Sequence, residues 1–468
     1  MARTKPASRD DNRRAGKASP RPAHRFAKLC MIATLAWGSC AIWNSVKPLP
    51  RGTRVASLPA RLNESQIDFL NDLAPAGAIL KRETEAIGRA EQTIVLDQSP
   101  LARELADALL LRKRQRPNLK VMLVTDPRNE VYGGTPSRTL SALERAGIVV
   151  VRTRLERLRD PNPLYSSLWR LCVGWWSDPF DEMPGKDTWR SSLRRLNLKA
   201  DRRQLLVADD GAGAWSSIVM SSPASIGATA STGAAASIGG ALSAGLGLEI
   251  RGHLAAAIVA SELQIAAWST DDDRLPAAPP GDSRGVGTID ARFLTEGAIQ
   301  TALRDAIAIA GSGDSIKIAV QAFGDRQMVD AVVRAAARGA RVQLLLDPGS
   351  RETQAAAGEL LREEPGSIEV RWRAGDSRAE AGYAVIQHRS DVWLDVGSAN
   401  FTRRGLDDLD LAADIELHMP ARAGPARAVT DLFAKHWSNA AAYASYADES
   451  RETYWRYRVA EATGLSMF

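Results

Sequence analysis

The side chains best suited to chemistry in this sequence follow a glycine in the sequence GSAN, which supplies Ser398 and Asn400. A hydroxyl and an amide two residues apart suit the binding of a phosphate or another anion, and Arg403 and Arg404 follow directly. The alternative is structural: the glycine turns a strand into a loop, and the polar side chains satisfy buried backbone groups. We favour the structural interpretation, because such a loop also organises a fold, and keep anion binding open.

Cysteine and histidine contribute little to this chemistry. The chain has three cysteines, Cys30, Cys40 and Cys172, and five histidines, with no Cys-x-x-Cys pair. Three cysteines do not form a disulfide framework, and a zinc site needs a denser set of ligands. We therefore expect no metal and no cofactor.

The length and charge of the chain limit the classes of function. The 468 residues are 45% hydrophobic and 25% charged, which is typical of an ordinary globular protein of two or three domains. The net charge is +6, but residues 1–28 hold nine Lys and Arg beside two Asp, which leaves −1 after Lys28. A neutral body argues against a nucleic-acid partner.

An apolar segment near the N-terminus indicates a membrane. Residues 29–46 are uncharged, and as a helix they would be about 27 Å long, enough to cross a hydrocarbon core. The basic residues before them are typical of a cytoplasmic flank. We expect a transmembrane signal anchor. A cleaved signal peptide is the alternative, because Ser39 and Ala41 suit a cleavage site.

The rest of the chain contains an internal repeat. Residues 85–127 and 305–348 both read as helix, apolar strand, amphipathic helix and a strand that ends in Asp-Pro. Residues 202–225 and 381–402 also correspond. Strands joined by crossover helices predict an α/β fold with parallel pairing, and two such units predict a pseudo-two-fold axis with a shared cleft.

The segment that begins at Gly397, GSANFTRRGLDDLDL, resembles the phospholipase D superfamily, in which a Gly-Ser-x-Asn segment follows an HxKxxxxD motif. The segments NEVYGG (129–134) and RDPNPLYSSLWR (159–170) are similar to bacterial members of the cardiolipin-synthase and phospholipase D type. The resemblance implies two α/β sandwich halves facing each other, a membrane and a phosphate-bearing lipid. In this family one histidine attacks phosphorus and the other protonates the leaving alcohol, while two lysines neutralise the phosphate.

The sequence departs from the family pattern at its catalytic centre. The positions that correspond to His, Lys and Asp are Arg202, Gln204 and Asp209 in the first half, and Glu380, Gly382 and Gln387 in the second half. Only Asp209 matches. A guanidinium has no usable lone pair, and a glutamate would repel a phosphate, so we expect no intact catalytic site.

Two further departures concern the phosphate loops. The first Gly-Ser-x-Asn is eroded to residues 221–224, which leaves Ser222 as its phosphate-binding candidate, and a Gly/Ala/Ser-rich tract at 225–247 follows. In the second half, Ala412 stands where we expect the carboxylate that orients the histidine.

A shifted alignment would place His388 on the nucleophile, since Asp395 follows at the required spacing. However, Ser390 then replaces the lysine, and one residue separates Asp395 from Gly397, which leaves no room for a strand. We therefore expect His388 to be an ordinary loop histidine.

Residues 164–180 are rich in aromatic side chains, including Trp169, Trp175, Trp176 and Phe180. A loop that covers the core is the simpler interpretation. An aromatic patch on a bilayer is the alternative, which the N-terminal apolar segment keeps open.

These observations give one prediction of organisation and two of function. The expected segments are a basic cytoplasmic tail (1–28), the transmembrane anchor (29–46), the first half (75–270), a linker (271–289), the second half (290–445) and a C-terminal tail (446–468). We expect a single-pass protein of a bacterial inner membrane with a periplasmic body. It is either a catalytically degenerate protein that binds a phospholipid headgroup or a protein partner, or an active phosphatidyl transferase with a rearranged site.

Overall fold

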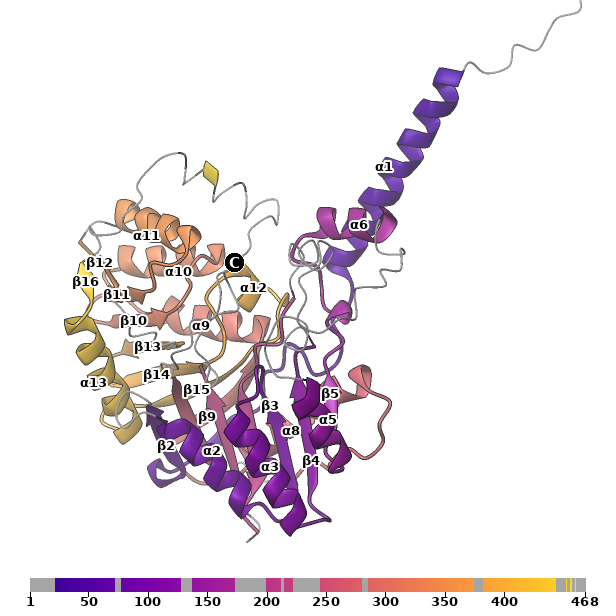
Figure 1. Ribbon diagram of the computed structural model, residues 1–468. Coiled ribbons are helices and arrows are strands. Elements are labelled where there is room, and N and C mark those ends of the chain that lie inside the picture. Colours follow the sequence, from indigo (N-terminus) through magenta and orange to yellow (C-terminus); the bar gives the residue numbers. More distant parts are fainter. Residues whose placement is uncertain are drawn as a thin grey trace, which may run out of the picture.

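The computed structural model describes residues 22–71, 77–127, 137–172, 199–211, 214–221, 245–279, 285–364, 366–373 and 382–442, with residues 452, 455, 456 and 459. Helix α1 (Pro22–Val46) projects away from an α/β body (Figure 1). Its segment Phe26–Val46 is long and apolar enough to cross a membrane and is only 6% buried. The predicted anchor at 29–46 lies within this helix.

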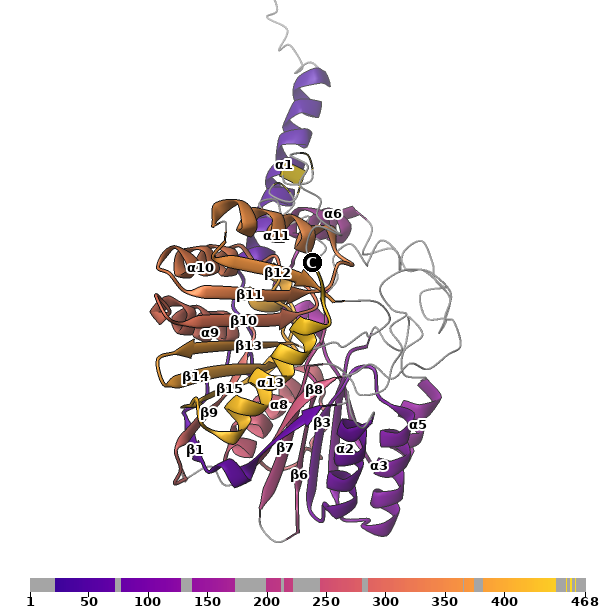
Figure 2. The ribbon, with the colours of Figure 1, turned by 90° about the vertical axis from the view of Figure 1, so that its left-hand side faces the viewer.

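The first sheet has seven strands in the order β2-β8-β7-β6-β3-β4-β5. Their bounds are β2 Ile67–Asn71, β3 Thr93–Asp97, β4 Lys120–Thr125, β5 Val149–Arg152, β6 Leu205–Asp209, β7 Trp215–Met220 and β8 Leu246–Arg251. Three helices cover its outer face, namely α2 (Ala78–Arg89), α3 (Arg103–Gln115) and α5 (Ser137–Arg145) (Figures 1 and 2). Helices α6 (Pro163–Cys172) and α8 (Leu254–Ser269) complete this part of the chain, with a 3₁₀ turn at Leu155–Arg157.

The second sheet has nine strands in the order β1-β9-β15-β14-β13-β10-β11-β12-β16. Their bounds are β1 Ala60–Leu62, β9 Ile289–Thr295, β10 Ser315–Val320, β11 Arg341–Leu346, β12 Ile368–Trp372, β13 Tyr383–His388, β14 Asp391–Gly397, β15 Ala413–Pro420 and β16 Ala441–Ala442. Helices α9 (Gly297–Ile309), α10 (Arg326–Ala337) and α11 (Arg351–Glu363) cover one face. The short helix α12 (Arg403–Leu406), helix α13 (Gly424–Ser438) and a 3₁₀ turn at Glu64–Gln66 are the remaining elements.

The main core lies between the two sheets. Val95 and Val207 of the first sheet and Val396 and Leu417 of the second sheet belong to one buried cluster, together with apolar residues of α8 and α13. Separate clusters fill the space between each sheet and its outer helices. Because the central strands are apolar on both faces, each sheet is covered on both sides, as the continuous apolar runs predict. The predicted class, a two-sheet α/β fold behind an N-terminal apolar helix, is confirmed.

The two sheets share one pattern of strand pairing. Strand β3 is parallel to β4 and antiparallel to β6, and β10 has the same relation to β11 and β13. The repeat in the sequence therefore corresponds to a repeated structural unit. The position of β1 was not predicted. This strand precedes the first half in the chain, but it pairs with β9 of the second sheet.

One fully buried arginine joins four parts of the chain. Arg203, just before β6, donates to Glu262 of α8 at 2.7 Å and to Glu296, which precedes α9, at 2.8 Å. It also donates to Ser261 at 3.0 Å and to the carbonyl of Gly52 at 2.9 Å. Burial alone would lower the pKa of this guanidinium, but the surrounding carboxylates raise the pKa above its usual value.

Replacing Arg203 by methionine should lower the free energy of unfolding by about 3–5 kcal/mol, because two buried carboxylates lose their counter-charge. Urea unfolding of the full chain in detergent micelles, followed by tryptophan fluorescence, measures this loss. Arg341→Met is the matched control, since its pair with Glu369 is exposed at 66% and 40% and should contribute less than about 1 kcal/mol. Equal losses in the two variants would contradict the central role of Arg203.

Candidate functional site

Strand register fixes which residues of the two halves correspond. Ile94 of β3 pairs with Ala208, and its counterpart Ile316 of β10 pairs with Ile386. The residues that follow, Asp209 and Gln387, are therefore equivalent. The same count makes Gln204 equivalent to Gly382, so the register supports the predicted alignment of the two motifs.

Arg202, at the first histidine position, joins the two halves. Its Nε donates to Asp410 at 3.0 Å, and its backbone N–H donates to the carbonyl of Leu411 at 2.9 Å. The other oxygen of Asp410 accepts from the N–H of Ala200 at 2.7 Å. The boundary between the halves that these contacts define is called the seam below. The side chain of Arg202 remains 45% exposed there.

The other two positions of the first motif have structural partners. Gln204, at the lysine position, is buried, and its Nε2 donates to the carbonyl of Ser99 at 2.9 Å. Asp209 accepts hydrogen bonds from the backbone N–H groups of Glu91, Gln92 and Thr93 at 2.7–3.1 Å. Its carboxylate therefore holds the turn between α2 and β3, at the opposite end of β6 from Gln204.

Gly382, at the second lysine position, has no room for a side chain. A Cβ atom there would lie 2.7 Å from the carbonyl oxygen of Gly397 and 3.6 Å from Cβ of Ser221. The backbones of Gly382 and Gly397 lie so close together that the side chain of a lysine would clash with the carbonyl of Gly397. Glu380 and Ser222 lie outside the described residues, so whether Arg202 faces Glu380 is a prediction that stays open.

The segment with Ser398 and Asn400 is held by β15. The hydroxyl of Ser398 accepts from the N–H of Ala413 at 3.1 Å, and Asp414 accepts from the N–H of Ala399 at 3.0 Å. These bonds support the structural interpretation for Ser398. Asn400 is half-buried at the same turn. The strand pairing also aligns the two loops. Val219 pairs with Leu205 in the first half, and Val396 pairs with Tyr383 in the second half, so Val219 and Val396 are equivalent. Counting two residues on from each makes Ser221, rather than Ser222, the counterpart of Ser398.

Sequence reasoning missed the carboxylate that supports this segment. Ala412 has no carboxylate, but Asp414, two residues further along the chain, is fully buried beside Gly397. A Cβ atom on Gly397 would lie 2.1 Å from Oδ1 of Asp414. Burial raises the pKa of Asp414 to about 6 and raises that of its neighbour Asp395 well above the usual value. Apolar and polar residues alternate along β15, which predicts a strand, but Asp414 is in the polar phase of this pattern, so the sequence did not indicate that it is buried.

His388 lies at the wrong end of its strand for catalysis at the seam. Six residues of extended chain separate it from Gly382, a distance of about 20 Å. Its Nδ1 is 2.8 Å from Oδ2 of Asp314, which places the ring at the start of β10. The expected loop histidine is instead the last residue of β13, and its contact with Asp314 is structural. Gln387, the residue before it, is half-buried.

The described residues contain no group of three or more His, Cys, Asp or Glu side chains arranged to hold a metal ion. The three cysteines are unpaired, and Cys30 and Cys172 are exposed. The described part of the aromatic segment is helix α6 with Leu164 and Trp169, whereas Trp175, Trp176 and Phe180 lie outside it.

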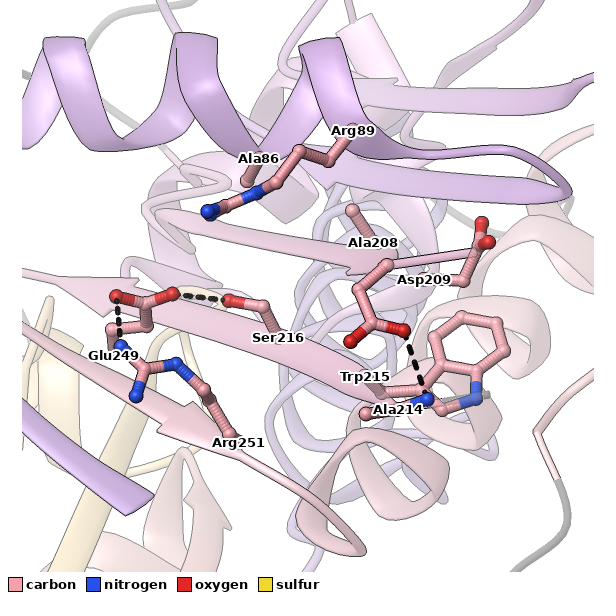
Figure 3. Close-up of a pocket in the computed structure, with 10 residues that line it drawn as sticks. Ala86, Arg89, Ala208, Asp209, Ala214, Trp215, Ser216, Glu249 and Arg251 are labelled. Carbon is pink, nitrogen blue, oxygen red and sulfur yellow. Dashed lines mark hydrogen bonds and ion pairs between the residues drawn. The ribbon is translucent and has the colours of Figure 1, made fainter. Parts of the chain in front are cut away.

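A hollow of about 200 Å³ lies between α2 and strands β6, β7 and β8 of the first sheet (Figure 3). It is lined by Ala86, Arg89, Ala208, Asp209, Asp210, Ala214, Trp215, Ser216, Glu249 and Arg251. Its charges are neutralised internally: Glu249 accepts from Ser216 at 2.7 Å and pairs with Arg82 at 2.8 Å and with Arg251 at 3.5 Å. The seam, not this hollow, is therefore the candidate functional site.

Two carboxylates, the buried Asp325 and the half-buried Asp407, lie beside the segment that contains Asn400. Asp325 caps α10 by accepting from the N–H of Met328 at 2.9 Å, and Gln300 donates to both Asp325 and Asp407 at 3.2 and 2.9 Å. The N–H of Asp325 donates to the carbonyl of Phe401, next to Asn400. Burial, aided by Asp407, raises the pKa of Asp325 to about 7.

The comparisons with known proteins concern the second half most directly. Residues 304–437 match the family model for the cardiolipin synthase, PLD-like domain. No curated protein matches the sequence. The structure resembles a phosphatidylserine synthase from Haemophilus influenzae Rd KW20, with a TM-score of 0.57 and 11% identity over 87% of this chain and 96% of that one. A phospholipase D family member, Nuc from Salmonella typhimurium, aligns with 17% identity over 33% of this chain and 98% of that one, at a TM-score of 0.28.

The family match rests on the second half, and the fold of the phosphatidylserine synthase covers both halves. The second half therefore contains a PLD-like domain of the cardiolipin synthase type, as the segment at Gly397 predicts. The chain also has an N-terminal helix suited to membrane anchoring.

The lack of space at Gly382 gives a direct prediction. Gly382→Ala should lower the free energy of unfolding by about 1–3 kcal/mol, because the added Cβ overpacks the backbone of Gly397. Gly88→Ala is the control: this glycine lies within α2 with nothing near its Cβ position, so the change should be neutral or stabilise by up to about 1 kcal/mol. Urea midpoints of the two full-length variants test the difference, and a neutral Gly382→Ala would show that a side chain fits.

The raised pKa of Asp325 predicts a pH dependence of stability. The folded state holds a proton that the unfolded carboxyl loses near its usual pKa of 3.8, so stability falls from about pH 4 to about pH 7 and is then constant. Asp325→Asn keeps a capping side chain without charge and should flatten this fall. Urea midpoints between pH 4.5 and 8 test it, with the 40%-exposed Asp330→Asn on the same helix as control. An unchanged slope in Asp325→Asn would contradict the assignment.

Proposed function

We propose that the chain is a membrane-anchored, non-catalytic member of the phospholipase D superfamily that binds a phosphate-bearing lipid headgroup at the seam. The observation that carries the loss of catalysis is the 2.7 Å approach at Gly382, which leaves no space for a lysine. The bond from Gln204 to Ser99 and the pairing of Arg202 with Asp410 support it, because neither side chain can act as a nucleophile.

The proposal of binding depends on the cations that remain at the seam. Arg202 is 45% exposed, and its pairing with Asp410 leaves further guanidinium donors. Arg403 begins α12, and its Nη1 donates to the carbonyl of Pro161, which brings a second guanidinium to the seam. Together with the half-buried amide of Asn400, these groups match the oxygens of a phosphate monoanion. A bilayer is the nearest source of such a group for a chain held by α1.

The orientation of the chain is also part of the proposal. The positive-inside rule places the basic residues 1–28 in the cytoplasm and the body on the opposite side, which in a bacterial inner membrane is the periplasm. A periplasmic body agrees with a function on lipids of the outer leaflet. Cleavage of the body by protease added to spheroplasts, with the membrane intact, would support this orientation.

The full chain, reconstituted into vesicles of phosphatidylglycerol and phosphatidylethanolamine, should show no headgroup transfer to added glycerol by mass spectrometry. Binding is measured separately, by native mass spectrometry of the detergent-solubilised chain with added phosphatidylglycerol. The double variant Arg202→Gln and Asn400→Ala should weaken this binding about tenfold or more, because it removes charge-assisted hydrogen bonds. Arg341→Gln, an exposed arginine outside the seam, is the control and should bind as the wild type does.

Two results would contradict the proposal. Turnover that His388→Ala abolishes would establish an active transferase with a rearranged site. Equal binding by the double variant and the wild type would show that the seam holds no headgroup.

A further inference from the structure

Helix α6 carries an apolar stripe on its surface. Leu164, Leu168 and Leu171 are spaced four and three residues apart, so they share one face of the helix, and they are 46%, 50% and 46% exposed. Ser166 and Ser167, on the other face, are buried. The three leucines of this helix therefore face outward and its two serines face the body. A helix on the surface of a soluble domain shows the opposite pattern, with apolar side chains facing the core.

This helix lies against the C-terminal part of α1 (Figures 1 and 2). The indole Nε1 of Trp37 donates to the carbonyl of Leu164 at 2.8 Å. Ala41 and Asn44 of α1 are buried, whereas Ile42, Trp43 and Val46 remain exposed. Most of the exposed large apolar residues among the described part of the chain belong to these two helices.

Charged groups gather where the two helices meet the body. Asp160, just before α6, accepts from Arg170 and from Lys199, the latter at 2.6 Å. Its N–H donates to the carbonyl of Asn44 at 3.0 Å, and Lys47 donates to the carbonyl of Glu156 at 2.6 Å. These bonds fix α6 relative to the C-terminal end of α1. They also show where, along α1, the apolar surface ends and charged groups begin.

The length of α1 decides where α6 lies. The 21 residues Phe26–Val46 are about 31 Å long as a helix. A hydrocarbon core is about 30 Å thick, so the whole segment is needed to cross it. If the part from Trp37 onwards were in water, the uncharged residues 29–36 would remain, and they reach only about 12 Å. The helix can cross only if the part that contacts α6 is itself in the membrane.

We infer that α6 is a second membrane element, embedded in the body-side leaflet beside α1 with Leu164 and Leu168 in contact with lipid. The partner of this face is the acyl region of a bilayer, and the ion pairs of Asp160 lie at its interface with water. The inference rests on the anchoring helix and not on headgroup binding at the seam. The sequence leaves open that residues 164–180 contact a bilayer through their aromatic side chains. Here the groups that enter the bilayer are the leucines of α6.

The test uses the full chain in which Cys30, Cys40 and Cys172 are replaced by alanine. Leu168→Cys and, separately, Leu111→Cys are labelled with bimane and reconstituted into phosphatidylcholine vesicles with or without brominated acyl chains. Leu111 is the matched control, because it is 55% exposed on α3 of the body. Bromine quenches only fluorophores in the acyl region, so we expect at least about a twofold loss of fluorescence at residue 168 and almost none at residue 111.

Quenching at residue 168 no greater than at residue 111 would overturn the inference and indicate water or a second copy of the chain at this face. Circular dichroism of both labelled proteins checks that they are folded. Leu164→Cys gives an independent second position on the same stripe and should behave as residue 168 does. Neither readout depends on lipid headgroup binding or turnover, so this test can fail while the proposed function holds, and the reverse.

Discussion

The arrangement of the two halves depends on the buried guanidinium of Arg203. Its hydrogen bonds to Glu262, Glu296 and the carbonyl of Gly52 join the first sheet, α8, the second sheet and the segment after α1. Removing an arginine and two carboxylates from water is costly, and these hydrogen bonds and charge pairs offset that cost. Glu296 also accepts from the N–H of Arg54 and of Ala412, which explains how it keeps a strained backbone with φ of 46°.

The motif positions beside this buried network make structural contacts. Arg202 and Gln204 flank Arg203 in the chain. Arg202 bonds to Asp410 of the second half, and Gln204 bonds to Ser99 within the first half. In the second half, Gly382 lies against the backbone of Gly397 in the same sheet, at a position where the resemblance implies a lysine. Of these three residues, Arg202 contributes a contact between the halves, whereas Gln204 and Gly382 contribute contacts within them. The proposed loss of catalysis agrees with these structural roles.

The sequence predicted the features that depend on pattern and repetition. Apolar runs such as β3 and the repeat of residues 85–127 were enough for the two-sheet fold, and GSAN at Gly397 was enough for the PLD-like domain of the second half. It could not predict Arg203, because neither its type nor its spacing distinguishes a buried arginine from its exposed neighbour Arg202. Nor could it predict β1, since three residues before the repeat carry no pattern that would assign them to the distant strand β9. Such features depend on tertiary contacts between residues far apart in the chain.

The same contacts couple the membrane helix to the body. The N–H of Val55 donates to Thr295 at 2.7 Å, and Trp268 donates to the carbonyl of Arg51 at 2.9 Å, so the segment after α1 is bound along its length. A flexible linker would let the body rotate freely above the bilayer. Here the segment passes directly beneath Arg203, and α6 is fixed to α1 through Asp160. The fold therefore sets the orientation of the seam relative to α1, and the proposed binding of a headgroup depends on such a fixed orientation.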